Sequence, residues 1–296
     1  MREFRFAVTA GGVGSVDDLA DICGAAEDYG FDVIAWVDHL YPNRTSPFLG
    51  LMAAASVSER LRLSTYILNL GFWNPALLAR DVASFVRLTG GRLELGLGGG
   101  IIKEQFDDAQ LPFDSFHDRM GKIATTLDVL DERLAQEADF TPPPVLIGGT
   151  SKQAIRLAAE RADIASFGGR FQLPGEEPGT MRIITADEAA ERSAYLWSIA
   201  GDRAGDIELN AFVLEVQVTD DRRGAIERLA AEADRHLMIP DLDAALESPF
   251  MLIGTEEEIA DQILASRERY GFSYITIQRP YLHTFGPIIE HIRKAQ

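Results

Sequence analysis

An acidic and an imidazole side chain stand next to each other at Asp38 and His39, directly after the apolar residues 33–37. A carboxylate beside an imidazole can fix its tautomer or raise its pKa into the working range, which suits acid–base catalysis. The alternative is a turn acid beside a packed histidine, but the position at the end of an apolar run favours the catalytic interpretation. The nearest candidate metal partners, Asp32, Asp38 and His117, lack any recognised ligand spacing, so we expect no metal site.

A second acid, Glu104, follows a run of three glycines that begins at Gly98. Such a flexible run can place a carboxyl group over a ligand. Glu104 can equally be a solvated loop acid, because Asp107 and Asp108 stand close to it. The residue types alone leave both interpretations open.

Glycine pairs followed by a polar residue occur twice, each time after an apolar segment. The two turns are Gly148-Gly149-Thr150 and Gly168-Gly169-Arg170. Paired glycines let the backbone approach an anion closely, and the N-terminus of a following helix adds N–H donors. The alternative is an ordinary tight turn that caps a helix. Two such turns in succession favour a phosphate site, because barrels often build these sites from neighbouring loops.

These residues need a scaffold that brings them together, and apolar strand-like segments alternate with helix-like segments along the whole chain. The predicted strands are residues 4–9, 33–37, 61–68, 93–97, 145–147, 164–167, 207–218 and 274–278. They are continuously apolar, as is typical of strands buried on both faces.

About eight strands, each followed by a helix, predict one α/β domain over residues 1–296: a (β/α)8 TIM barrel with insertions at its C-terminal face. The alternative is an open doubly wound sheet, which would usually carry the pattern G-x-G-x-x-G after its first strand. Residues 10–14 read Ala-Gly-Gly-Val-Gly and do not match that pattern. Active sites of barrels lie at the C-terminal strand ends, where the polar and glycine residues described above are found.

The chain is acidic, with 28 Lys and Arg against 46 Asp and Glu and a net charge of −18. A field of this sign repels phosphate backbones, so we expect neither nucleic acid nor an anionic membrane as a partner. The single Cys23 cannot form an intrachain disulfide, and no apolar run approaches the roughly 20 residues needed to span a bilayer. We therefore expect a cytoplasmic globular protein.

Several segments together carry a family resemblance. They are residues 36–40, 74–80, 88–100, 104–106, 143–149, 157–163 and 252–260. In this order the chain resembles the luciferase-like monooxygenase superfamily of flavin- and deazaflavin-dependent barrels, and within it the actinobacterial branch that uses coenzyme F420.

The resemblance implies roles for the candidate residues. Asp38 and His39 would lie at the face of the deazaflavin where hydride leaves or arrives, with Asp38 orienting His39. Glu104 would donate the accompanying proton. A non-proline cis peptide of the family would fall near Tyr66-Ile67 in the third strand. The cofactor-binding residues would be Tyr66, Ile67, Asn69, Gly98, Gly148, Gly149, Thr150, Gly168, Gly169 and Arg170.

The leading hypothesis is therefore an oxidoreductase that moves a hydride between coenzyme F420 and an unidentified small organic substrate. The second is an FMN-dependent monooxygenase that receives reduced flavin from a separate reductase, and the third is a non-catalytic flavin- or deazaflavin-binding paralogue. Family members suggest a homodimer. Because coenzyme F420 carries a phosphodiester and a polyglutamate tail, basic residues should gather at the barrel mouth. The candidates are Arg44, Arg80, Lys152, Arg170 and Arg279.

Overall fold

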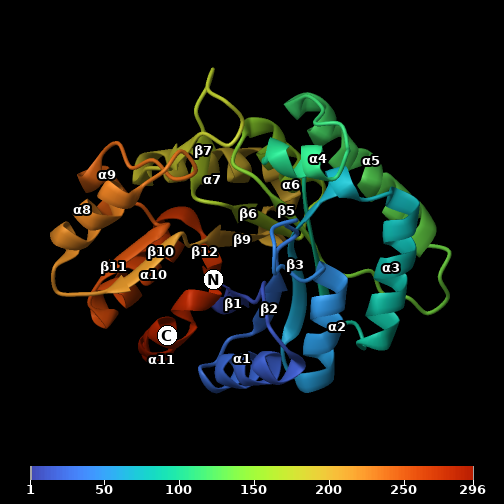
Figure 1. Cartoon of the computed structure of the whole chain (residues 1–296), viewed down its shortest axis with the longest axis horizontal. Helices are drawn as coiled ribbons and strands as arrows, with labels where there is room; N and C mark the ends of the chain where they lie inside the picture. Colours follow the sequence, from blue (N-terminus) through green and yellow to red (C-terminus); the bar gives the residue numbers. More distant parts are fainter. Residues whose placement is uncertain (1, 296) are drawn as a thin grey trace.

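The computed structural model describes residues 2–295 and contains a closed barrel of eight parallel strands, with helices between successive strands (Figure 1). The barrel strands, in the order in which they neighbour one another, are β1 (Arg5–Thr9), β12 (Phe272–Gln278), β9 (Glu208–Phe212), β6 (Ile164–Phe167), β5 (Val145–Gly148), β4 (Leu93–Gly98), β3 (Arg62–Asn69) and β2 (Val33–Trp36). The prediction of a (β/α)8 barrel is confirmed.

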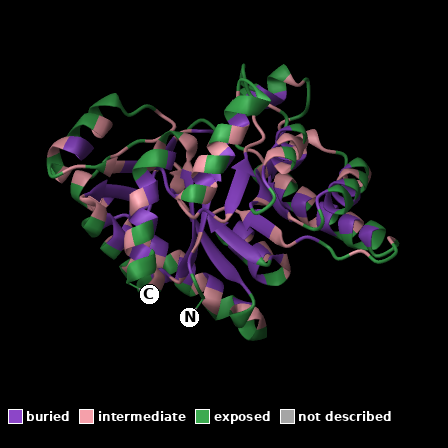
Figure 2. Cartoon of the chain, turned by 90° about the horizontal axis from the view of Figure 1, so that it is seen from below, coloured by how far each residue is buried: buried purple, intermediate pink, exposed green. Residues whose placement is uncertain are grey.

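Eight long helices surround the barrel, and Figure 2 shows buried strands enclosed by helices whose outer faces are exposed. These helices are α1 (Val16–Asp28), α2 (Pro47–Val57), α3 (Pro75–Leu88), α5 (Phe116–Leu134), α6 (Lys152–Arg161), α7 (Ala186–Ala200), α10 (Glu256–Tyr270) and α11 (Leu282–Lys294). The start of α3 illustrates how the sequence begins a helix. The Asn74 side chain accepts hydrogen bonds from the first backbone N–H groups of α3, and Pro75 is preset for a first helical turn.

With one exception, the 3-10 helix between α7 and β9, the remaining elements are inserted after the C-terminal ends of the strands, as the sequence predicts. They are the 3-10 helices η1 (Leu70–Phe72), η2 (Gly201–Gly205) and η3 (Arg279–Tyr281), the helices α4 (Lys103–Asp108), α8 (Arg222–Glu232) and α9 (Leu242–Leu246), the hairpin β7 (Arg170–Gln172) with β8 (Met181–Ile183), and the pair β10 (Glu215–Val218) with β11 (Met251–Gly254). Figure 1 shows α4 and the β7–β8 hairpin along one edge of the barrel, with α8 and α9 to one side.

One predicted strand is two strands. Residues 207–218 divide into β9, which belongs to the barrel, and β10, which pairs with β11 outside it. The backbone N–H of Val213 still bonds Thr276 of the barrel, whereas the N–H of Leu214 bonds Phe250. The chain therefore leaves the barrel between these two residues.

The barrel interior contains a buried polar cluster below the mouth. The hydroxyl of Tyr66 lies 2.7 Å from Ser166 Oγ and donates to Asn210 Oδ1 at 2.8 Å. Asn210 in turn donates to Thr276 Oγ1 at 2.8 Å. Because each of these buried polar groups has a hydrogen-bond partner within the cluster, the cluster holds the side chains below the mouth in place.

The N-terminal strand ends carry a second buried polar cluster. Glu94, which is 1% exposed, accepts hydrogen bonds from Arg62 at 2.8 Å, from Tyr274 at 3.2 Å and from Arg5. Arg5 also pairs with Glu208 at 2.7 Å. Arg5 and Arg62 are thus matched by carboxylates, whereas Arg92, which precedes β4 at the same end, donates to backbone carbonyls.

Within residues 2–295, no helix combines the length and the apolar character that crossing a bilayer requires.

Candidate active site at the barrel mouth

His39 follows β2 at the mouth and is half-buried. Its Nδ1 lies 3.3 Å from Oε1 and 3.2 Å from Nε2 of Gln105, and Tyr41 packs beside the ring with 5.4 Å between centroids. Burial lowers the pKa of His39; Gln105 opposes this shift, and the positive charges of Arg44 and Arg170 add to it. His39 is therefore neutral near pH 7, the form that can accept a proton.

Asp38 has partners other than the His39 ring. Its Oδ2 accepts from the backbone N–H of Asn69 at 3.0 Å and from the indole N–H of Trp73 at 2.8 Å. Burial raises the pKa of Asp38, and these two hydrogen bonds partly offset the rise. The structure thus corrects one expectation: the hydrogen-bond partner of the ring is Gln105, whereas Asp38 ties the end of β2 to the end of β3.

Glu104 and Gln105 are consecutive residues of α4 in different environments. Gln105 is 3% exposed and faces His39. The Glu104 side chain is 60% exposed and accepts from Arg235 at 2.8 Å. A hydrogen bond from its own backbone N–H and the charge of Arg235 lower the pKa of Glu104. An exposed, ionised carboxylate is poorly suited to donate a proton, so this arrangement does not favour the predicted role of Glu104.

Arg235 also joins two of the insertions. Besides Glu104 of α4, its guanidinium pairs with Glu177, in the turn between β7 and β8, at 3.1 Å. The next residue, His236, lies with Nδ1 3.2 Å from the carbonyl oxygen of Gly179 in the same turn. The segment after α8 is therefore linked to both α4 and the hairpin.

The peptide bond between Tyr66 and Ile67 in β3 is cis, which confirms the expectation from the family resemblance. The Ile67 side chain lies against two neighbouring strands that carry glycine at the facing positions. A Cβ atom at Gly98 or at Gly148 would lie 2.4 or 2.6 Å from Ile67 Cδ1. Only glycine at both positions leaves room for this side chain.

Asn69 ends β3 and is buried beside the glycine run that follows β4. Its Oδ1 accepts from the backbone N–H of Gly71 at 3.1 Å. Gly100 has a φ of +68° and lies so close that a Cβ there would be 2.4 Å from the same oxygen. The structure thus brings Asn69 to the mouth beside the ends of β3 and β4.

The two predicted glycine turns lie next to each other. Thr150 Oγ1 donates to the backbone carbonyl of Arg170 at 3.2 Å, which joins the turn after β5 to the turn after β6. Gly149 has a φ of +146°, and a Cβ at Gly168 would meet no atom within 4 Å. Ser151 accepts from Ala154 N–H and so caps α6 beside this open space. The open space at Gly168 leaves room for a ligand beside the joined turns.

Three of the five predicted basic residues reach the mouth. Arg44 donates to the carbonyl of Gly11 at 3.1 Å and Arg279 to that of Gly12 at 3.3 Å, both in the loop after β1. Arg170 carries a buried Nε atom without a hydrogen-bond partner among the described residues.

The side chains of the other two basic residues contact helical residues instead. Arg80 is exposed on α3 and pairs with Asp81 at 2.8 Å. Lys152 begins α6, and its ammonium group lies 5.9 Å from the centre of the Tyr195 ring.

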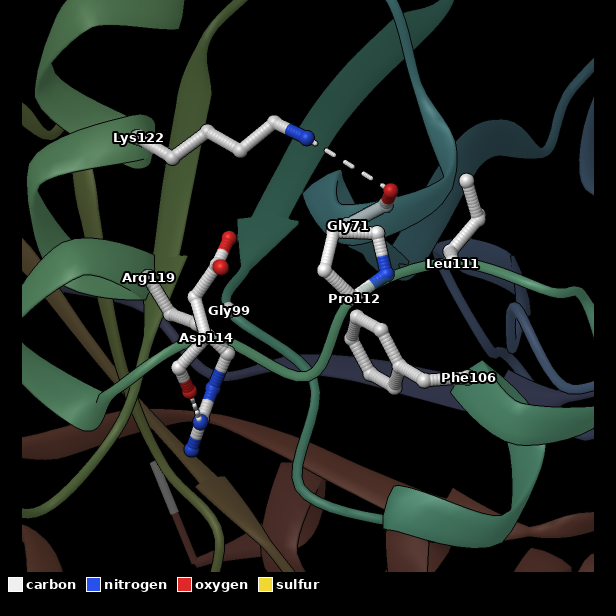
Figure 3. A pocket seen from close by; sticks show the side chains of 8 residues that line it. All are labelled: Gly71, Gly99, Phe106, Leu111, Pro112, Asp114, Arg119 and Lys122. Carbon is white, nitrogen blue, oxygen red and sulfur yellow. Dashed lines mark hydrogen bonds between the residues drawn. The ribbon is translucent and has the colours of Figure 1, made fainter.

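A side cavity of about 270 Å³ opens beside the ends of β3 and β4 (Figure 3). It is lined by Gly71, Gly99, Phe106, Leu111, Pro112, Asp114, Arg119 and Lys122. Figure 3 shows the Lys122 ammonium group directed towards the Gly71 carbonyl, 3.5 Å away, and Arg119 bonded to the backbone oxygen of Asp114. Arg119 Nε is buried without a partner among residues 2–295. Arg119 lies on a helix and not at a strand end, so sequence reasoning missed it.

Among the described residues, no three His, Cys, Asp or Glu side chains gather in an arrangement that could hold a metal ion.

The comparison with known families agrees with this geometry. The model of the Luciferase-like monooxygenase family matches residues 3–274. The chain belongs to this family. This luciferase-like chain is 25% identical over 282 residues to an F420-dependent glucose-6-phosphate dehydrogenase of Nakamurella multipartita, covering 84% of this chain and 78% of the relative. It is also 25% identical over 245 residues to an F420-dependent hydroxymycolic acid dehydrogenase of Mycobacterium tuberculosis, covering 65% of this chain and 67% of the relative.

Solved structures with the same fold include an F420-dependent dehydrogenase and a monooxygenase. An F420-dependent secondary alcohol dehydrogenase, solved with an F420–acetone adduct, matches with a TM-score of 0.75 and 16% identity over 99% of this chain and 100% of its own. The EDTA monooxygenase of Chelativorans sp. BNC1 matches with a TM-score of 0.71 and 14% identity over 98% of this chain and 94% of its own. At these identities the similarity establishes the fold alone.

Proposed function

We propose that this luciferase-like protein is an oxidoreductase that transfers a hydride between coenzyme F420 and a small organic substrate. The F420-dependent dehydrogenases among its relatives, one of which matches 84% of the chain, support the cofactor. The observation that carries the chemistry is the His39 ring, which Gln105 holds at Nδ1 where β2 opens into the mouth.

His39 is the proposed proton-transfer residue. Its Nδ1 faces Gln105, and its Nε2 has no hydrogen-bond partner among residues 2–295. Nε2 can therefore exchange a proton with the hydroxyl or carbonyl oxygen of a substrate. Because an amide offers both an oxygen and an NH₂ group, Gln105 can bind Nδ1 in either protonation state of the ring.

The residues at the mouth fit a deazaflavin with a phosphate-bearing chain. The bound cofactor would supply the carbon that donates or accepts the hydride. Ile67, Asn69 and Gly98 would contact its ring system, since all three lie at the ends of β3 and β4. The glycine turns after β5 and β6, with open space at Gly168, would hold its phosphate through backbone N–H groups other than that of Gly149, which donates to the Ser166 carbonyl. Arg119 and Lys122, which line the side cavity, would add positive charge for an anionic tail.

We also propose that the enzyme acts as a cytoplasmic homodimer. Three exposed leucines on the neighbouring helices α2 and α3, namely Leu49, Leu77 and Leu88, supply apolar surface for a second copy. Light scattering of the purified chain tests this part of the proposal, and a mass of one chain at micromolar concentration would contradict it.

Titration of the purified chain with coenzyme F420 and, separately, with FMN tests the proposed cofactor. We expect saturable binding of F420 at least tenfold tighter than that of FMN, and F420-dependent oxidation of some members of a panel of secondary alcohols. Tighter binding of FMN, with oxygen consumption when a separate reductase supplies reduced FMN, would establish the alternative monooxygenase function. Tight binding without turnover in either assay would indicate a non-catalytic paralogue.

A further inference from the structure

Three consecutive residues of α4 contact three different parts of the molecule. Glu104 pairs with Arg235 near the surface, and Gln105 faces the His39 ring. Phe106 points into the protein and is 1% exposed. A run of three glycines leads into this helix, so the preceding backbone does not fix how the helix is turned. The contacts of its side chains must do so.

α4 is too short to hold its own position. It has six residues, and among the described residues no side chain caps its start. Isolated helices of this length are marginal in water and depend on tertiary packing. The ion pair between Glu104 and Arg235 contributes little, because the two side chains are 60% and 39% exposed. The buried ring of Phe106 is therefore the apolar anchor of the helix.

The Phe106 ring lies in an aromatic socket formed by Gly71, Phe72 and Phe113. The ring centroids are 5.2 Å from Phe72 and 5.0 Å from Phe113, within the range of favourable aromatic pairs. A Cβ atom at Gly71 would overlap Cε1 and Cζ of Phe106, so the ring fits only because residue 71 has no side chain. The side cavity borders the same ring and leaves empty space beside it (Figure 3). The aromatic socket thus holds a ring that could otherwise shift into the cavity.

A shift of this ring would reach His39 through Gln105. Adjacent residues of a helix point about 100° apart and turn together, so a rotation of α4 that moves Phe106 also moves Gln105. The amide of Gln105 lies 3.2 and 3.3 Å from His39 Nδ1, close to the longest distance of a hydrogen bond. A small displacement of the helix is therefore enough to break this contact.

We propose that Phe106 is a positioning residue for the reaction: seated in the aromatic socket, it fixes α4 so that Gln105 holds Nδ1 of His39. Phe106 does not reach the reacting atoms and acts only through its neighbour. This inference rests on the proposed function, because it takes His39 to be the proton-transfer residue.

The test uses the ¹⁵N NMR signals of the His39 ring in the full chain, without added ligand. Both ring nitrogens respond to the hydrogen bond at Nδ1 and to the tautomer that it favours. Gln105→Leu gives the signals of a ring that has lost this partner. We expect Phe106→Ala to move the signals close to those of Gln105→Leu. The double variant should then match Gln105→Leu alone, since residues that act as a unit are not additive.

Gly71→Ala tests the aromatic socket from its other side. Gly71 has no left-handed φ, so alanine suits its backbone, but the added methyl group must displace the Phe106 ring. The His39 signals should move as in Phe106→Ala, and adding Phe106→Leu should restore them, because a smaller side chain makes room. Gly286→Ala is the matched control. A Cβ there would overlap the Tyr29 ring, between α11 and α1 and far from α4 in Figure 1, and the His39 signals should stay unchanged.

Wild-type signals in Phe106→Ala would overturn the proposal, since α4 would then keep its place without the ring. A Gly71→Ala effect that Phe106→Leu does not reverse would overturn it too, because the methyl group would act on another neighbour. Should Phe106→Ala not fold, Phe106→Leu is the second variant, and it must move the signals in the direction of Gln105→Leu. Failure of the proposed function is distinguishable, because these signals require neither cofactor nor turnover.

Discussion

The two ends of the barrel differ in the partners of their arginine side chains. At the N-terminal strand ends, Arg5 and Arg62 converge on the buried Glu94, and Arg5 has Glu208 as a second partner. At the C-terminal ends, Arg44 donates to the Gly11 carbonyl, and neither Arg44 nor Arg170 has a carboxylate within ion-pair distance among the described residues. Buried carboxylates thus bind Arg5 and Arg62 at one end, whereas Arg44 and Arg279 at the mouth donate to backbone carbonyls.

We expect this difference to separate residues that stabilise the barrel from residues that bind ligands. A buried ion cluster with complete hydrogen bonding holds strands in place and leaves no group for chemistry. An unmatched guanidinium costs folding free energy unless something else neutralises it. We therefore expect substitutions at the N-terminal end to change stability and substitutions at the mouth to change binding and turnover.

Loss of the His39 ring should give the largest effect. His39→Ala removes the proposed proton-transfer group, so turnover should fall by roughly 10²–10⁴. Cofactor affinity should change little, because the phosphate would be held at the glycine turns. Turnover and F420 affinity are to be measured on the same preparation. If affinity collapses while turnover per bound cofactor stays normal, His39 is a binding residue and the proposed role is wrong.

A substitution at the opposite end should affect stability alone. Glu94→Gln removes the charge that Arg5 and Arg62 share, and we expect the free energy of unfolding to fall by about 3 kcal/mol. Denaturant titration measures this change, and turnover of the folded variant at 25 °C should match the wild type. Glu290→Gln, which breaks an exposed pair with Lys294, is the control and should leave the free energy of unfolding nearly unchanged. A loss of turnover in Glu94→Gln without loss of stability would contradict the comparison.

Replacing the amide that holds His39 should shift the pH dependence. In the wild type, burial lowers the pKa of His39 below its ordinary value, so His39-dependent turnover should be lost as pH falls below about 6.5. Gln105→Glu places a carboxylate against Nδ1 and favours the protonated ring, so the loss should begin about one pH unit higher or more. The pH profile of kcat/KM measures the shift, and Gln105→Leu should lower turnover without raising this pKa. An unchanged profile in Gln105→Glu would show that Gln105 does not position the catalytic ring.

The neighbouring acid should matter least. Glu104→Gln removes one side of an exposed ion pair with Arg235, so turnover should change less than about twofold. A tenfold loss together with a changed pH profile would restore the proton-donor role that the family resemblance implies for Glu104.

The fold was predictable because its signals are repeated along the chain. Each barrel strand is a short apolar run that a helix follows, and the right-handed connection of parallel strands leaves few arrangements for eight such units. The insertions were less predictable. Residues 207–218 read as one strand because the apolar pattern continues through residues 213 and 214, and only the tertiary hydrogen bonds of Val213 and Leu214 show that the chain changes sheets there.

The candidate site was predictable where a residue directly follows a strand. The barrel strands fix the positions of Asp38, His39 and the glycine turns, because these residues directly follow them. The cis bond at Tyr66-Ile67 lies where the family resemblance implied it. The orientation of α4 about its own axis was not predictable. The glycines before this helix do not determine which of its side chains faces His39. The sequence therefore drew attention to Glu104, whose charge suggests chemistry, whereas the neutral Gln105 is the residue that contacts His39.

The contact of Ile67 with Gly98 and Gly148 limits which substitutions relatives of this protein can carry at these three positions. These residues come from three adjacent strands, and an added methyl group at either glycine would overlap Ile67 Cδ1. A single replacement at one glycine is therefore disfavoured until the side chain at position 67 becomes smaller. In an alignment of relatives, the three positions should change together, with a larger residue at 98 or 148 accompanied by a smaller one at 67.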